Sequence, residues 1–172
     1  WNKRTKAADS SKPAARGPRE HPMGSVGLQR VPRAGKTREI AEAFNEMREA
    51  AMAAGYNNGP GIQQEFVKKH KVVAFKCVNY EKRLLDGNVP PQFAVAGNLP
   101  ESTLWGVPLS DGTLAVLPSL SMYGGNVHKY AGMKELFKSN YESGSYRKIV
   151  VNEPAIVRKD FTIIRQGELF LA

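Results

Sequence analysis

Residues 61–86 read GIQQEFVKKHKVVAFKCVNYEKRLLD, and this stretch decides the fold because it supports two different arrangements. Apolar residues recur along it at helical spacing, in one stripe and in the row beside it: Phe66, Val73, Cys77, Tyr80 and Leu84, then Val67, Ala74, Val78 and Leu85. This pattern predicts one amphipathic helix over residues 61–86, about 39 Å long at 1.5 Å per residue. The alternative ends the helix at His70 and makes residues 71–78 a strand, because the β-branched and aromatic residues there favour sheets. We prefer the single helix, since the stripe persists on both sides of the disputed part.

The residues before this stretch predict a second helix, from about Arg38 to Ala54. Thr37 is a suitable N-cap, and Gly55 is a typical stop. Apolar residues again recur at helical spacing, at Ile40, Phe44, Met47, Ala51 and Ala54. The Asn-Gly-Pro turn of residues 56–60 would join the two helices into an antiparallel helical hairpin.

The second half of the chain predicts short antiparallel strands. Residues 89–125 are rich in proline and glycine, and residues 103–109 and 113–117 flank a Ser-Asp-Gly turn in the manner of a β-hairpin. Pro108 and Pro118 confine these two strands to sheet edges or to strand ends. A short helix is expected over residues 130–142. Strands are expected over residues 147–151, 156–158 and 161–172, with a turn at residues 152–154.

Positive charge is concentrated in the first 38 residues. This segment holds ten basic and two acidic residues, or +8, whereas residues 39–172 hold 15 basic and 14 acidic residues, or +1. Its prolines and glycines and its lack of large apolar residues predict an extended basic arm, with residues 24–35 as linker. We therefore predict an α+β protein with an extended arm over residues 1–38 and a single small domain over residues 39–172.

Several classes of protein are disfavoured by the composition. No run of apolar residues approaches the ~18 that a membrane-spanning helix needs. The single cysteine, Cys77, cannot form an internal disulfide and is expected to be buried and inert. A basic, serine-containing beginning without an initiating methionine resembles what surrounds an organellar presequence. We therefore expect a mitochondrial location, in the matrix or at the matrix face of the inner membrane.

Motifs for catalysis or for cofactor binding are weak. Residues 34–37, Ala-Gly-Lys-Thr, match the end of a P-loop, but Arg30 stands at the first glycine position and Pro32 removes an amide donor. No pair among His21, His70 and His128 has the spacing of a metal-binding helix. An enzyme site would have to lie among Trp105, Tyr123, His128 and Tyr130, where no nucleophile and base can be named together. We assign no catalytic, cofactor-binding or metal-binding residue.

The basic arm supports the most specific functional prediction. Cations on a flexible backbone can follow a phosphate chain and release its counterions. The expected binding residues are Lys3, Arg4, Lys6, Lys12, Arg16, Arg19, Arg30, Arg33, Lys36 and Arg38. A second group of basic residues either forms a solvated helix face or adds to the positive electrostatic field of the arm at the same partner. Its members are Lys68, Lys69, Lys71, Lys76, Lys82 and Arg83.

These features predict a non-catalytic structural subunit of a large mitochondrial assembly, in contact with other subunits. We expect a mitochondrial ribosomal protein whose arm contacts rRNA. The alternative is an accessory subunit of a respiratory-chain or ATP synthase complex, with the arm against an acidic protein surface or anionic lipid.

Overall fold

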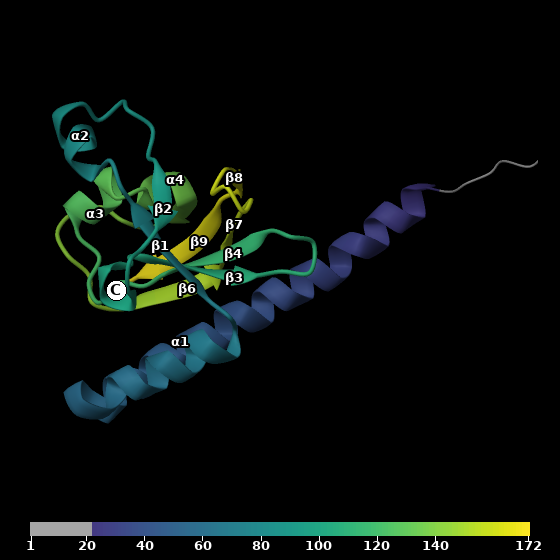
Figure 1. The fold of residues 1–172 in the computed structure, drawn as a ribbon, viewed down its shortest axis with the longest axis horizontal. Coiled ribbons are helices and arrows are strands. Elements are labelled where there is room, and N and C mark those ends of the chain that lie inside the picture. The colour runs from purple at the N-terminus through teal and green to yellow at the C-terminus, as the bar shows by residue number, and fades with distance from the viewer. Residues whose placement is uncertain (1–21) are drawn as a thin grey trace, which may run out of the picture.

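The computed structural model describes the chain from Pro22 to Ala172, with side chains from Gly35 onward (Figure 1). In chain order its helices are α1 (Pro22–Lys69), α2 (Tyr80–Leu85), the 3₁₀ turn η1 (Leu99–Glu101), α3 (Gly125–Tyr130) and α4 (Met133–Leu136). Its strands are β1 (Val73–Cys77), β2 (Phe93–Val95), β3 (Leu104–Pro108), β4 (Leu114–Pro118), β5 (Phe137–Ser139), β6 (Ile149–Glu153), β7 (Ala155–Val157), β8 (Ile163–Arg165) and β9 (Gly167–Leu171).

The strands form two sheets, and the predicted α+β class is confirmed. An antiparallel sheet of six strands has the order β2-β1-β3-β4-β7-β8. A smaller sheet has the order β5-β9-β6, with β5 parallel and β6 antiparallel to β9. Helix α1 lies along one side of both sheets (Figure 1) and contacts β4 and β6.

The predicted helical hairpin is present inside α1, with its turn at Gly55. Gly55 has φ 80° and ψ −175°, which breaks the helix into two antiparallel arms (Figure 1). Residues equidistant from Gly55 meet across the arms: the Phe44 and Phe66 rings lie 5.9 Å apart, and Gly59 packs directly on the carbonyl of Ala51. The turn predicted at residues 56–60 is wrong, since those residues are helical.

The single helix predicted over residues 61–86 is wrong, and the alternative reading is correct. The chain leaves the helix in a Schellman motif, in which the Val72 N–H donates to the Val67 carbonyl at 3.0 Å and Lys71 has φ 53°. Strand β1 then pairs with β3 on one side and with β2 on the other. These backbone hydrogen bonds across the sheet, together with the high sheet propensity of residues 72–78, outweigh the helical stripe.

Two further predictions need correction. Residues 22–38, expected to be extended, belong to α1; the hairpin arm that follows has already met the cost of helix nucleation, so these residues need only propagate it. The single helix expected over residues 130–142 is replaced by the end of α3, by α4 and by β5. Gly132 causes this break, because it has φ 88° and lies directly against the Phe93 ring.

The predictions for the second half of the chain agree with the structure in part. Strands β3 and β4 form the expected hairpin, and Pro108 and Pro118 lie at strand ends. The tail forms strands as expected, but residues 152 and 153 belong to β6 and not to a turn, and the strand expected over residues 161–172 is divided into β8 and β9. Cys77 is buried and free.

The hydrophobic core lies between α1 and the sheets. Trp105 of β3 stacks on Phe66 at 5.9 Å and meets Phe44 edge to face at 6.0 Å, so both arms of the hairpin are packed against the six-stranded sheet. Each fully buried aromatic or aliphatic side chain contributes about 1.5–3 kcal/mol to such packing. This packing fixes the position of α1 and of the exposed side chains that it carries.

Candidate functional site

The ten basic residues expected to bind a partner are distributed unevenly over the described chain. Six of them, Lys3, Arg4, Lys6, Lys12, Arg16 and Arg19, lie outside the described residues. Arg30 and Arg33 fall in the part of α1 for which only the backbone is described. Lys36 and Arg38 are exposed on α1, and the Arg38 Nε lies 3.4 Å from a Glu42 carboxylate oxygen in a solvated ion pair.

Lys36 is brought close to the end of the second hairpin arm. The His70 imidazole packs on the Phe66 ring, with ring centres 4.4 Å apart. Burial lowers the pKa of His70 from its ordinary value of 6.5, and the charges of Lys69 and Lys36 lower it further. Lys36 from the first arm and Lys69 from the second therefore act on one imidazole.

We call the four exposed lysines at this end of the hairpin the hairpin-base cluster: Lys36, Lys68, Lys69 and Lys71. The cluster brings three members of the second basic group, Lys68 and Lys69 at the end of α1 and Lys71 just after it, close to Lys36 of the basic segment. Exposed ammonium groups in this arrangement can contact a polyanion without losing an internal partner, since no described ion pair involves them.

The other three members of the second basic group do not join the cluster. Lys76 lies on β1, with its Nζ 3.8 Å from a Glu101 carboxylate oxygen, and Lys82 is exposed on α2. Arg83 is buried, with 1% of its surface exposed. The six basic residues of the second group therefore do not lie on one helix, as the helix predicted over residues 61–86 would require, because the chain changes direction at Lys71.

Arg83 instead links four segments of the domain by hydrogen bonds and an ion pair: α2, the chain at Val89, the end of α3, and α4. Its Nε donates to the Val89 carbonyl at 2.9 Å, and Nη1 donates to the Tyr130 carbonyl at 2.8 Å. Nη2 forms an ion pair with Glu135 of α4. Sequence analysis grouped Arg83 with solvated cations. No signal in the sequence marked its burial, since Arg83 is the one buried residue of α2 and the leucines beside it are exposed.

The residues named for a possible enzyme site are brought together only in part. A 2.7 Å hydrogen bond joins the Tyr123 hydroxyl to Nδ1 of His128, and His128 stacks on Tyr141 at 4.4 Å. Trp105 lies instead in the core against α1, and Tyr130 pairs with Tyr80. Burial raises the pKa of Tyr123 above its ordinary value and lowers that of His128. Both groups are thus held neutral, which suits a structural hydrogen bond.

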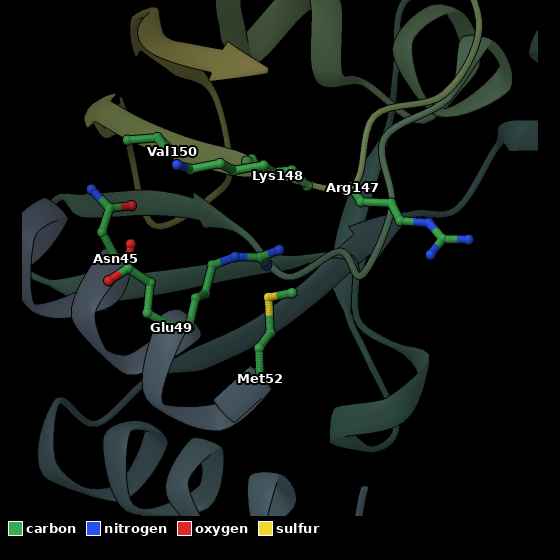
Figure 2. Close-up of a pocket in the computed structure, with 8 residues that line it drawn as sticks. Asn45, Glu49, Met52, Arg147, Lys148 and Val150 are labelled. Carbon is green, nitrogen blue, oxygen red and sulfur yellow. The ribbon is translucent and has the colours of Figure 1, made fainter. Parts of the chain in front are cut away.

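A groove between α1 and β6 was not anticipated from the sequence (Figure 2). It has a volume of about 300 Å³, and its lining residues come from one arm of α1 and from the chain at the start of β6: Asn45, Arg48, Glu49, Met52, Arg147, Lys148, Ile149 and Val150. Asn45 fixes one end by exchanging two hydrogen bonds of 2.9 Å with the backbone of Val151. The one signal in the sequence was an asparagine, a poor helix former, in the middle of a strong helix.

Among residues 35–172, whose side chains the structure describes, no cluster of residues is suited to hold a metal ion. Of the helices within residues 22–172, none combines the length and the apolar character needed to span a membrane. Comparisons with models of known protein families, with curated proteins and with solved structures give no match.

Proposed function

We propose that this protein is a non-catalytic structural subunit of a large mitochondrial assembly, a ribosomal protein whose basic N-terminal segment contacts rRNA. The observation that carries the proposal is the distribution of charge, with +8 in residues 1–38 beside +1 in residues 39–172. The hairpin-base cluster supports it, because Lys36 of the basic segment is joined there by three further exposed lysines, Lys68, Lys69 and Lys71.

The mode of binding follows from the chemistry of lysine and arginine in this segment. Their charges neutralise phosphates and release condensed counterions, so affinity falls steeply as salt rises. Trp1 is the only Phe, Trp or Tyr residue before Phe44, so the segment offers almost no aromatic ring that could stack on bases. Contact with the RNA backbone therefore accounts for binding better than recognition of base sequence does.

Binding of the full chain to a single-stranded RNA across a salt series tests this mode. For single strands the logarithm of affinity changes with the logarithm of salt by about −0.7 for each phosphate neutralised. Replacing Lys36, Lys68 and Lys69 with glutamine should reduce the magnitude of that slope by about 2. The matched control replaces three exposed lysines elsewhere, Lys82, Lys129 and Lys159, and should leave the slope unchanged. Equal slopes for the two triple variants would show that the hairpin-base cluster does not contact the RNA.

Sedimentation of the native protein from a detergent-solubilised mitochondrial lysate tests the assembly. If the protein sits on rRNA, ribonuclease should move it from a large particle to small fractions. If it stays in a large particle after ribonuclease, the partner is protein or lipid, and the accessory subunit of a respiratory-chain or ATP synthase complex replaces the ribosomal protein.

A further inference from the structure

The groove between α1 and β6 is open along the edge of a sheet. The three-stranded sheet has the order β5-β9-β6, so β6 is an edge strand within the described part of the chain. In Figure 2, Asn45, Glu49 and Met52 extend from α1 on one side of the groove, and Lys148 and Val150 lie on the other. A sheet edge beside a cavity is where an extended peptide can be added as a further strand.

The hydrogen-bond pattern of β6 shows which backbone groups face the groove. Lys148 exchanges both backbone hydrogen bonds with Ala172, at 2.9 and 3.0 Å, and the register then pairs Ile149 with Leu171 and Val151 with Leu169. In an antiparallel pair the bonded positions alternate, so the N–H and C=O of Ile149 and of Val151 point away from β9. Asn45 confirms this at Val151, because its side chain bonds both of these groups.

Asn45 also indicates what fits at the next position. Its carboxamide has the same donor and acceptor as a peptide group, and it pairs with Val151 as a neighbouring strand would. Ile149 presents the same two groups one step along the edge, beside the cavity. A peptide group placed there would continue the pattern that Asn45 begins.

The lining selects for the side chains of such a peptide. Arg48, Arg147 and Lys148 oppose one acidic residue, Glu49, so the charge of the lining is positive. Met52, with 68% of its surface exposed, and Val150 supply apolar surface. The chain's own residues 1–38 carry +8 and would be repelled, which argues for a segment of another protein.

We propose that the α1–β6 groove binds an extended peptide segment of a partner protein, with acidic and apolar residues alternating, as an added strand against Ile149. The peptide backbone bonds to the edge, apolar side chains enter the cavity beside Met52, and carboxylates meet Arg147 and Lys148. This site uses residues other than the hairpin-base cluster, so it does not depend on the RNA-binding proposal.

Titration of the full chain with a synthetic peptide, acetyl-Glu-Val-Asp-Val-Glu-amide, tests the proposal, with NMR as the readout. We expect saturable shifts of the Ile149 amide and slower hydrogen exchange there. Methylating the central peptide nitrogen should weaken binding about fivefold, since it removes one backbone donor. A peptide with lysine in place of the acidic residues should show no binding.

Charge reversal of the lining provides the matched variants. Arg147→Glu with Lys148→Glu should weaken binding of the acidic peptide about tenfold, whereas Lys159→Glu, exposed and remote from the groove, should not. Three results would overturn the proposal: no shift of the Ile149 amide with this peptide or with variants of its apolar positions, equal affinity for the methylated peptide, or protection of Ile149 by an RNA oligonucleotide instead of by peptide.

Discussion

Gly167 stands at a point where the start of β9 crosses the turn between β6 and β7. A Cβ atom there would collide with the Glu153 carbonyl oxygen and with the backbone of Pro154 and Ala155. None of these is the end of a flexible side chain, so the clash cannot be relieved locally. The position therefore requires glycine for close approach of two backbones.

We predict that Gly167→Ala lowers the free energy of unfolding by about 3 kcal/mol, because two backbone segments must separate to admit one methyl group. Urea denaturation followed by circular dichroism measures this change. Gly87→Ala is the control, since a Cβ at Gly87 meets nothing within 4 Å. A loss no larger than that of the control would mean that the crossing adjusts freely.

Lys71 holds the left-handed conformation that ends α1, with φ 53°. This backbone conformation costs a residue with a Cβ atom about 1–2 kcal/mol of conformational energy, and it costs glycine little. We predict that Lys71→Gly raises the free energy of unfolding by up to about 1 kcal/mol, after the greater entropy of glycine in the unfolded chain is deducted. Thermal denaturation checks the sign, and Lys69→Gly, at the last residue of α1, should instead be destabilising.

His128 gives the stability a pH dependence. Burial lowers its pKa in the folded chain, with Lys134 adding to the effect and Glu135 opposing it. Below the ordinary value of 6.5 the unfolded chain binds a proton before the folded chain does. The contribution of His128 is therefore fully present above pH 6.5 and is lost as the pH falls toward the lower folded pKa.

We predict that the free energy of unfolding decreases between pH 7.5 and pH 5.5 and that His128→Gln reduces this decrease. Urea denaturation of both proteins at the two pH values supplies the measurement. His70 contributes in the same direction, since its pKa is also lowered, so a smaller decrease should persist in the variant. An unchanged pH dependence in the variant would show that His128 titrates normally.

At the scale of elements, the ion pair between Arg83 and Glu135 links α2 to α4. Arg83 is 1% exposed and the Glu135 side chain 23% exposed, so the pair is largely removed from water. Its guanidinium also holds the carbonyls of Val89 and Tyr130. Removing one member of such a pair costs more than the pair itself contributes, because the other charge stays buried.

We predict that Arg83→Met lowers the free energy of unfolding by about 3 kcal/mol, the lower end for a buried pair because Glu135 keeps some solvent contact. Lys82→Met, on the exposed side of the same helix, should change it by less than about 0.5 kcal/mol. Adding Glu135→Leu to Arg83→Met should recover part of the loss. Strictly additive losses in this double-mutant cycle would show that the two side chains are not coupled.

At the scale of the molecule, the buried surface of α1 begins before the boundary expected from charge. Thr37 is 4% exposed and Ile40 is 1% exposed, so the packed body includes residues that precede Glu39. A deletion intended to remove the basic segment alone therefore has to end before Thr37. Removing residues 1–34 meets this requirement and leaves Lys36 in place.

We predict that deletion of residues 1–34 changes the free energy of unfolding by less than about 0.5 kcal/mol, because the buried residues that the structure describes on α1, from Thr37 onward, are all retained. Under the proposed function the same deletion should abolish sedimentation with the large particle. Denaturation and sedimentation of one variant separate the two effects. Normal incorporation of a folded, truncated protein would contradict an anchoring role for the segment.

The sequence by itself determined the features that depend on neighbouring residues. Helical spacing located the first arm of the hairpin, Gly55 marked its end, and the Ser-Asp-Gly turn joined β3 to β4, because each rests on local conformational preference. The separation of charge between residues 1–38 and the rest is likewise a property of the sequence.

Only the tertiary structure decided the features that depend on distant partners. Residues 73–77 became a strand because β2 and β3, at least sixteen positions away, bond to both of its edges. The same holds for the sites: the hairpin brings Lys36 to Lys69, and Arg83 finds Glu135 across 52 positions. Backbone pairing and burial stabilise contacts between residues that are far apart in the sequence. A pattern of neighbouring residues carries no information about those contacts.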